Sequence, residues 1–198
     1  MIIDISSYNG RIDFEQMAKG ENIERIILRG TTKNGQLDVR FMENINGICQ
    51  HLDGKMPVDV YKFSYARNYG DAAAECYNLI ATLKQKGVFN IINMIWLDLE
   101  DFDGRAHTTN ECGLIISAYD TICRMFGVKF GIYCNYNYLK NILPKWTAAW
   151  PIWLARYNSQ MGNVGDFNVV MWQYTSSGSC AGITGAVDIS KYVKGGDI

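Results

Sequence analysis

Apolar and polar positions follow two different periods along the chain, and the change of period predicts a succession of strands and helices. Apolar residues at every second position predict eight strands, at residues 1–5, 25–29, 58–65, 94–100, 129–135, 152–157, 168–174 and 186–189. Apolar residues at helical spacing predict helices at residues 12–19, 39–52, 71–86, 108–126 and 136–143. Strands and helices therefore alternate through the first six strands.

Capping residues support the two longest helices. Asp71 is a candidate N-cap for the third helix, which Gly87 ends. Thr108 and Glu111 have the spacing of a capping box, in which each side chain accepts a backbone N–H of the other, and Gly127 ends that helix.

The order of these elements predicts an α/β fold. Strands that alternate with helices form parallel sheets, and eight of them are typical of a closed (β/α) barrel. The last connections are too short and too rich in glycine and serine to hold full helices. We therefore expect an irregular TIM-like barrel with eight strands and about five helices, and we expect residues 1–198 to form a single domain.

Composition excludes several classes of protein. The chain has 198 residues, of which 48% are hydrophobic and 20% are charged, and a net charge of −1, so it gives no reason to expect a nucleic-acid or membrane partner. No apolar run is long enough to span a bilayer, and the start of the chain is a strand without the pattern of a signal peptide.

Cysteine and histidine argue against two further kinds of site. The six cysteines contain no C-x-x-C pair, so neither a zinc knuckle nor a redox motif is predicted, and most are expected to be reduced core residues. The two histidines, His51 and His107, are too few for a three-histidine metal site and make a histidine-based triad improbable.

The fourth strand carries the candidate chemistry. In residues 94–100, Asp98 and Glu100 fall on one face, about 7 Å apart along the strand. Two close carboxylates that lose solvation push one pKa upward, which can create a general acid beside an ionised partner. The alternative is an ordinary strand end with two solvated acids.

In parallel barrels the site lies at the carboxyl ends of the strands. Those ends hold four acids and a set of mostly aromatic residues: Asp4, Asp98, Glu100 and Asp188, with Tyr61, Phe63, Tyr65, Tyr133, Asn135, Trp153, Tyr157 and Gln173. The absence of a glycine-rich phosphate loop argues against a phosphorylated substrate. Carboxylates can also bind Mg²⁺ or Ca²⁺, but the aromatic residues favour a sugar ring.

These residues resemble the bacterial and phage muramidases of glycoside hydrolase family 25. The resemblance covers nearly the whole chain through DIS at residues 4–6, GRIDF at 10–14, ILR at 27–29, VYKFSYA at 60–66, WLDLED at 96–101, GIYCN at 131–135, WLARY at 153–157, WQYTS at 172–176 and VDI at 187–189. The departures are Asp59, where a small residue is usual, and the segment TTK at 31–33, where a Gly/Tyr-rich loop is usual. Both are expected to alter the groove more than the chemistry.

The resemblance implies hydrolysis of the β-1,4 bond from N-acetylmuramic acid to N-acetylglucosamine in peptidoglycan. We expect no metal or other cofactor, because the acids outnumber the plausible metal partners and no histidine joins them. The resemblance places the family's acids on Asp4, Asp98, Glu100 and Asp188. We expect Glu100 to donate the proton and Asp98, which lies deeper, to stay ionised and to support attack by the substrate's 2-acetamido group, with retention at the anomeric carbon. Asp4 and Asp188 are expected to be supporting acids.

Two other functions stay open at this stage, a non-catalytic peptidoglycan-binding domain and a chitin-directed glycosidase. We expect a monomer that acts on bacterial cell-wall peptidoglycan, either secreted or released to the wall as a phage endolysin. The sequence does not distinguish phage from bacterial origin.

Overall fold

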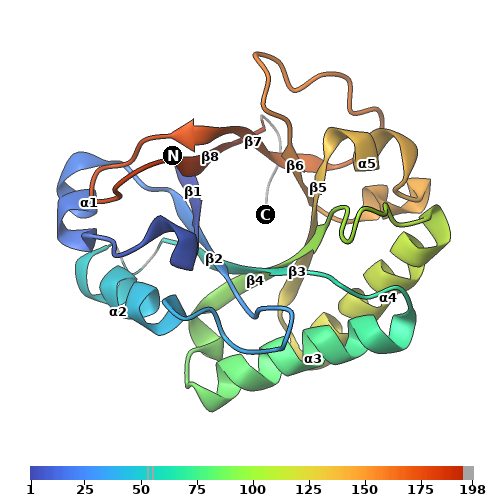
Figure 1. The fold of residues 1–198 in the computed structure, drawn as a ribbon, viewed down its shortest axis with the longest axis horizontal. Helices are drawn as coiled ribbons and strands as arrows, with labels where there is room; N and C mark the ends of the chain where they lie inside the picture. Colours follow the sequence, from blue (N-terminus) through green and yellow to red (C-terminus); the bar gives the residue numbers. More distant parts are fainter. Residues whose placement is uncertain (53, 55, 194–198) are drawn as a thin grey trace.

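Eight strands close into one barrel in the computed structural model, which describes residues 1–52, 54 and 56–193. The strands are β1 (Ile2–Ile5), β2 (Arg25–Arg29), β3 (Val58–Phe63), β4 (Ile92–Leu99), β5 (Lys129–Asn135), β6 (Ile152–Ala155), β7 (Val169–Gly178) and β8 (Val187–Tyr192). The helices are α1 (Phe14–Gly20), α2 (Phe41–His51), α3 (Tyr69–Gln85), α4 (Thr109–Phe126) and α5 (Tyr136–Asn141). They lie outside the ring of strands (Figure 1). The predicted irregular eight-stranded α/β barrel is confirmed.

The cap of α4 is confirmed and the cap of α3 is corrected. Thr108 and Glu111 form the reciprocal capping box, and Gly127 ends α4 in the left-handed conformation. The N-cap of α3 is Asn68 rather than Asp71, because the Asn68 side chain accepts the backbone N–H of Asp71 at 2.9 Å. Asparagine and aspartate cap equally well, so the sequence alone did not separate the two.

The last strand runs against the parallel direction that the strand–helix alternation predicts. β8 pairs antiparallel with both β7 and β1, whereas the other neighbouring pairs are parallel. A parallel pair needs a crossover connection, and the short link between Gly178 and Val187 holds no helix. The chain therefore turns back on itself, and β8 closes the barrel as the second strand of a hairpin.

Two apolar cores lie on the two faces of the barrel wall. On β4, Ile95, Leu97 and Leu99 face the helices, while Met94 and Trp96 face the barrel interior, as the alternation predicts. The interior core is built from Ile2, Ile27, Met94, Trp96, Tyr133, Trp153, Ala155, Val170 and Met171. Because side chains fill the barrel, its interior has space only near its ends.

A buried ion pair lies on the interior face below this core. Asp59, with 0% of its surface exposed, pairs with Arg25. Its carboxylate also accepts Trp96 Nε1–H at 2.8 Å and an Asn93 Nδ2–H at 3.1 Å. Asp59 does not line the acid-bearing pocket, so the expectation that it shapes the substrate groove is wrong. It neutralises the guanidinium of Arg25 instead.

The cysteines are free, as predicted, and five of the six are buried while Cys49 is exposed. The side chains of Cys76 and Cys123 meet between α3 and α4 with 3.7 Å between their sulfur atoms. In the part of the chain that the structure describes, no helix is long and apolar enough to cross a membrane.

Candidate active site

Four carboxylates meet at one end of the barrel. Asp4 is on β1, Asp98 is the penultimate residue of β4, Glu100 follows β4 directly, and Asp188 is the second residue of β8. Because β8 is antiparallel, Asp188 reaches this end from the start of its strand, not from a carboxyl end as predicted. A pocket of about 220 Å³ is lined by Asp4, Tyr61, Asp98, Glu100, Tyr133, Trp153, Tyr157, Gln173 and Asp188.

Asp98 lies deeper than Glu100. The Asp98 side chain is 6% exposed, and its Oδ1 has no hydrogen-bond partner among residues 1–52, 54 and 56–193. Glu100 is half-buried, beyond the end of β4. An unpaired oxygen on a buried carboxylate costs free energy unless a donor reaches it. The relative depths therefore agree with the predicted order, and the unpaired Oδ1 is buried.

Burial changes the charge state of this pair. Loss of solvation, and next the charge of Glu100, raise the pKa of Asp98 well above its ordinary value, although Lys62 and Arg29 oppose the rise. Burial, followed by the charges of Asp101 and Asp188, raises the pKa of Glu100. The sequence predicts that Asp98 stays ionised. The raised pKa means that in the free protein Asp98 gives up its proton less readily than a solvated aspartate does. A hydrogen-bond donor to the carboxylate would favour the ionised form again.

Asp4 and Asp188 face one another directly across the β1–β8 pair. Burial and the charge of Asp188 raise the pKa of Asp4 well above its ordinary value. Burial also raises the pKa of Asp188, but its hydrogen bond with Asp4 acts in the opposite direction and lowers it. Burial therefore favours the protonated form of Asp4 more strongly than that of Asp188.

The side-chain amide of Gln173 fixes the orientation of Asp4. Gln173 Nε2 donates to Asp4 Oδ2 at 2.8 Å. The hydroxyls of Tyr133 and Tyr157 both donate to Gln173 Oε1, each at 2.9 Å. With both tyrosines donating to its oxygen, Gln173 can only present its NH₂ group to Asp4. This network orients one wall of the pocket before any substrate binds.

Three residues predicted for the site lie outside this pocket. Phe63 ends β3, and its ring centroid lies 4.8 Å from that of Tyr65, which follows the strand. The Asn135 side chain accepts the backbone N–H of Tyr138 at 3.0 Å and so caps α5. Asn135 is therefore used within the fold, while Phe63 and Tyr65 form an aromatic pair beside the pocket wall.

Two cations near Asp98 were not predicted as site residues. Lys62 is buried and donates from Nζ to the carbonyl oxygen of Phe63 at 2.7 Å. Arg29 ends β2, opposite Tyr61 in the strand pairing. Arg29 stands at the carboxyl end of a predicted strand, so the same rule that found Asp98 would have found it. Lys62 lies on the outer face of β3, where the strand-end rule does not point to it.

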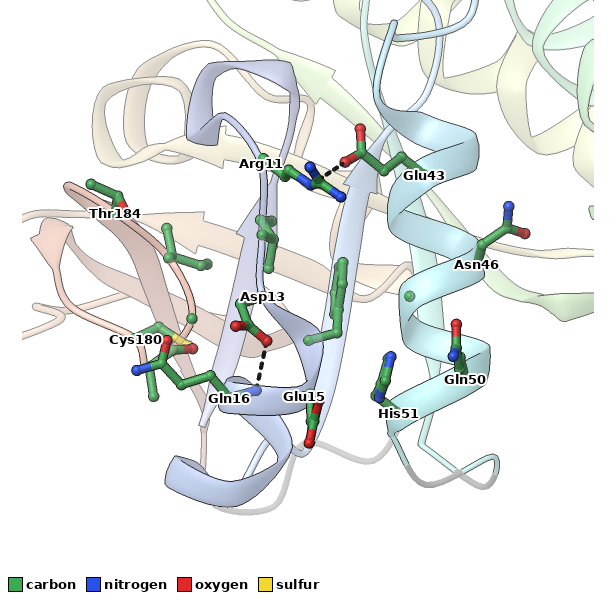
Figure 2. Close-up of a pocket in the computed structure, with 16 residues that line it drawn as sticks. Arg11, Asp13, Glu15, Gln16, Glu43, Asn46, Gln50, His51, Cys180 and Thr184 are labelled. Atoms are coloured by element: carbon green, nitrogen blue, oxygen red, sulfur yellow. Dashed lines mark hydrogen bonds and ion pairs between the residues drawn. The ribbon is translucent and has the colours of Figure 1, made fainter.

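A larger groove of about 890 Å³ lies elsewhere, between α1, α2 and residues 180–184 (Figure 2). Arg11 bridges it toward Glu43, with 3.6 Å from Nε to Oε1, and Asp13 turns back to cap α1. None of the four pocket acids lines it. Within the described residues no group of three or more His, Cys, Asp or Glu side chains is placed to hold a metal ion.

A sequence model of the glycosyl hydrolases family 25 matches residues 3–183. The chain belongs to this family. The matched range contains Asp4, Asp98 and Glu100 and ends before Asp188. The resemblance predicted from the sequence motifs is therefore confirmed, and the chain is a glycoside hydrolase by family.

Relatives of this glycosyl hydrolase include the autolytic lysozyme of Clostridium acetobutylicum, 22% identical over 98% of this chain and 56% of that protein. Among solved structures, the modular autolysin LytC of Streptococcus pneumoniae, in complex with a synthetic peptidoglycan ligand, matches with a TM-score of 0.84 and 26% identity over 97% of this chain and 46% of that one. The bacterial lysozyme of Streptomyces coelicolor matches with a TM-score of 0.77 and 18% identity over 96% of this chain and 90% of that one. The chain spans about half the length of the first two relatives.

The raised pKa values of the pocket acids predict how stability depends on pH. A carboxyl whose pKa is higher in the folded than in the unfolded chain holds more protons when folded, so the free energy of unfolding falls as pH rises from the unfolded pKa of about 4 toward the folded value. Burial raises the pKa of Asp98 and of Asp4 in this way. Denaturant titrations between pH 4 and pH 8 should show that decline.

The variant Asp98→Asn removes one of these groups and should decline less steeply with pH than wild type. Asp166→Asn, which removes an exposed carboxylate, should keep the wild-type pH dependence. Equal slopes for wild type and Asp98→Asn would show that burial of Asp98 does not shift its titration.

Proposed function

We propose that this chain is an N-acetylmuramidase that hydrolyses the β-1,4 bond between N-acetylmuramic acid and N-acetylglucosamine in bacterial cell-wall peptidoglycan. The observation that carries the proposal is the pair at the end of β4, a buried Asp98 with an unpartnered oxygen and a more accessible Glu100. The relatives named as lysozymes and autolysins support the substrate class.

The proposed first step uses both carboxyl groups. The carbonyl oxygen of the 2-acetamido group attacks the anomeric carbon, the bond from that carbon to the leaving oxygen breaks, and Glu100 gives its proton to that oxygen. The amide nitrogen becomes positively charged, and its N–H donates to the carboxylate of Asp98, whose Oδ1 has no other partner among the described residues. An N–H donor at this position lowers the pKa of Asp98, so substrate binding supplies the ionised carboxylate.

The second step returns the site to its starting state. Water attacks the anomeric carbon from the face that the leaving group left, and the carboxylate of Glu100 takes its proton. The bond from that carbon to the acetamido oxygen breaks at the same time, and its electron pair restores the neutral 2-acetamido group. Two displacements at one carbon retain its configuration. Direct attack by water in a single step would invert it, so the product anomer separates the two routes.

Asp4, Asp188 and the amide of Gln173 are proposed to form hydrogen bonds with the sugar, and the charges of Asp4 and Asp188 are proposed to tune the pKa values of the central pair. Tyr61, Tyr133, Trp153 and Tyr157 are proposed to contact the sugar ring, with Phe63 and Tyr65 beside them. The pocket of about 220 Å³ is smaller than the roughly 300–1,000 Å³ typical of sites that enclose a whole ligand. Most of a glycan polymer would therefore lie outside it, along the barrel end.

The first test is the release of reducing sugar from purified cell walls by the purified chain. We expect release from cell walls and a much lower rate on chitin oligosaccharides. Binding to cell walls without release would favour the non-catalytic binding domain, and an equal or higher rate on chitin would favour a chitin-directed enzyme.

The second test is NMR of the first-formed product. A β-configured reducing end, before mutarotation, is expected from retention. An α-configured product would rule out participation of the acetamide and would assign a general-base role to an aspartate.

A further inference from the structure

Arg29 lies at the mouth of the acid-bearing end of the barrel. It is the last residue of β2, on the same strand face as Ile27, which packs in the barrel interior. Its pairing partner is Tyr61, which lines the pocket. Arg29 is half-buried rather than enclosed, so its guanidinium is placed beside the pocket and remains reachable.

Arg29 has an aromatic neighbour that is unusually exposed. The guanidinium carbon lies 5.3 Å from the centroid of the Tyr8 ring. Tyr8 belongs to the 3₁₀ turn Ser7–Asn9 and is 86% exposed. An exposed aromatic ring next to a cation, at the edge of a carbohydrate site, offers one surface for a sugar face and one charge for an anion.

The positive charge of Arg29 opposes the rise that burial causes in the pKa of Asp98, but within the described residues no ion pair neutralises it. In the described part of the chain no carboxylate forms an ion pair with Arg29. Asp38 influences its titration but is committed to Ser7, whose hydroxyl donates to it at 2.8 Å, and to the backbone N–H of Arg40 at 3.0 Å. Arg25, on the same strand, has Asp59 as a dedicated partner.

We infer that Arg29, beside Tyr8, binds a carboxylate of the muramyl unit and thereby discriminates muramyl glycans from neutral N-acetylglucosamine polymers. This inference rests on the proposed function. Muramic acid differs from glucosamine by a lactyl ether, which carries a carboxylate or continues into a peptide that carries carboxylates. The acids of the pocket disfavour such an anion. A guanidinium that has no carboxylate partner among the described residues can bind it through two parallel hydrogen bonds.

The test compares substrates that differ in one charge. The substrates are peptide-free glycan strands with free lactyl carboxylates, the same strands with the lactyl groups converted to methylamides, and intact strands that carry peptides. The variants are Arg29→Gln, which removes the charge, and Arg29→Lys, which keeps the charge but lacks the paired N–H donors of the guanidinium. Arg124→Gln, an exposed arginine on α4, is the control for net charge.

We expect Arg29→Gln to raise KM for the free-lactyl strands by about tenfold or more, as loss of a charged hydrogen bond predicts, with a smaller change in kcat. The methylamide strands should be cleaved alike by wild type and Arg29→Gln. The KM of Arg29→Lys for the free-lactyl strands should lie between those of wild type and Arg29→Gln. The KM of Arg124→Gln should match that of wild type. An effect confined to the peptide-bearing strands would assign the carboxylate to the peptide and would also support the inference.

Equal losses on charged and methylamide strands would overturn the inference, because Arg29 would then act through the pocket acids or the fold. Unchanged KM on every substrate would overturn it as well. Binding of the free-lactyl strands to Glu100→Gln and to the double variant Glu100→Gln/Arg29→Gln, measured by calorimetry, tests Arg29 without turnover. If wild type cleaves none of the strands, the proposed function fails, while a tenfold difference in this binding would still support the carboxylate site.

Discussion

Replacement of Glu100 by glutamine is expected to lower the rate of peptidoglycan hydrolysis by about 10²–10⁴-fold, the usual contribution of a positioned general acid. Glutamine has nearly the same shape as glutamate and cannot give a proton to the leaving oxygen. Burial and neighbouring acids raise the pKa of Glu100, which favours the protonated form that a general acid needs. Release of reducing sugar from purified cell walls measures the loss.

Glycosides with an activated aryl leaving group control for folding and binding, because that leaving group departs without a proton. The Glu100→Gln variant should release the aryl group in a single turnover at close to the wild-type rate, because only the second step then needs Glu100, as a base. The matched variant Asp166→Asn removes an exposed carboxylate outside the acid-bearing pocket and should leave hydrolysis of cell walls intact. A near-normal rate of Glu100→Gln on cell walls would show that another group protonates the leaving oxygen.

The variant Asp59→Ala should lower the free energy of unfolding by about 3–5 kcal/mol, the cost of leaving one partner of a buried ion pair alone. Arg25 is 3% exposed and would lose its carboxylate, while Trp96 and Asn93 would each lose a hydrogen-bond acceptor. Denaturant unfolding at neutral pH measures the change.

Two comparisons isolate the cause. The double variant Arg25→Met/Asp59→Leu removes both charges and should lose much less stability than Asp59→Ala. Lys19→Ala breaks the exposed pair with Glu15 and should leave the free energy of unfolding almost unchanged. A loss of that small size for Asp59→Ala would mean that water or a rearranged side chain compensates Arg25.

The sequence pattern was sufficient to predict features that are decided within a single segment of the chain. The alternation in β4 predicted that Met94 and Trp96 face the interior, and the structure confirms it. The capping box of α4 was predicted because both of its residues lie in four consecutive positions. The closed barrel followed from the number and order of strands, and nine of the twelve predicted site residues line one pocket.

Pattern was insufficient where the partner is distant in the chain. The direction of β8 depends on its pairing with β1, and the role of Asp59 depends on Arg25, 34 residues earlier. The raised pKa of Asp98 comes from its burial, which depends on the whole barrel. The catalytic roles, the single domain over residues 1–198 and a monomeric state stay predictions.

The pairing of β1 with β8 has a consequence for synthesis on the ribosome. Asp4 leaves the exit tunnel long before Asp188, which is translated after the other seven strands of the barrel. The ring cannot close while β8 is missing, so a nascent or truncated chain holds Asp98 and Glu100 on an open, unfinished sheet. Hydrolytic competence would therefore arise in one step, once β8 has been translated and has paired with β1, and fragments that lack β8 would be inactive.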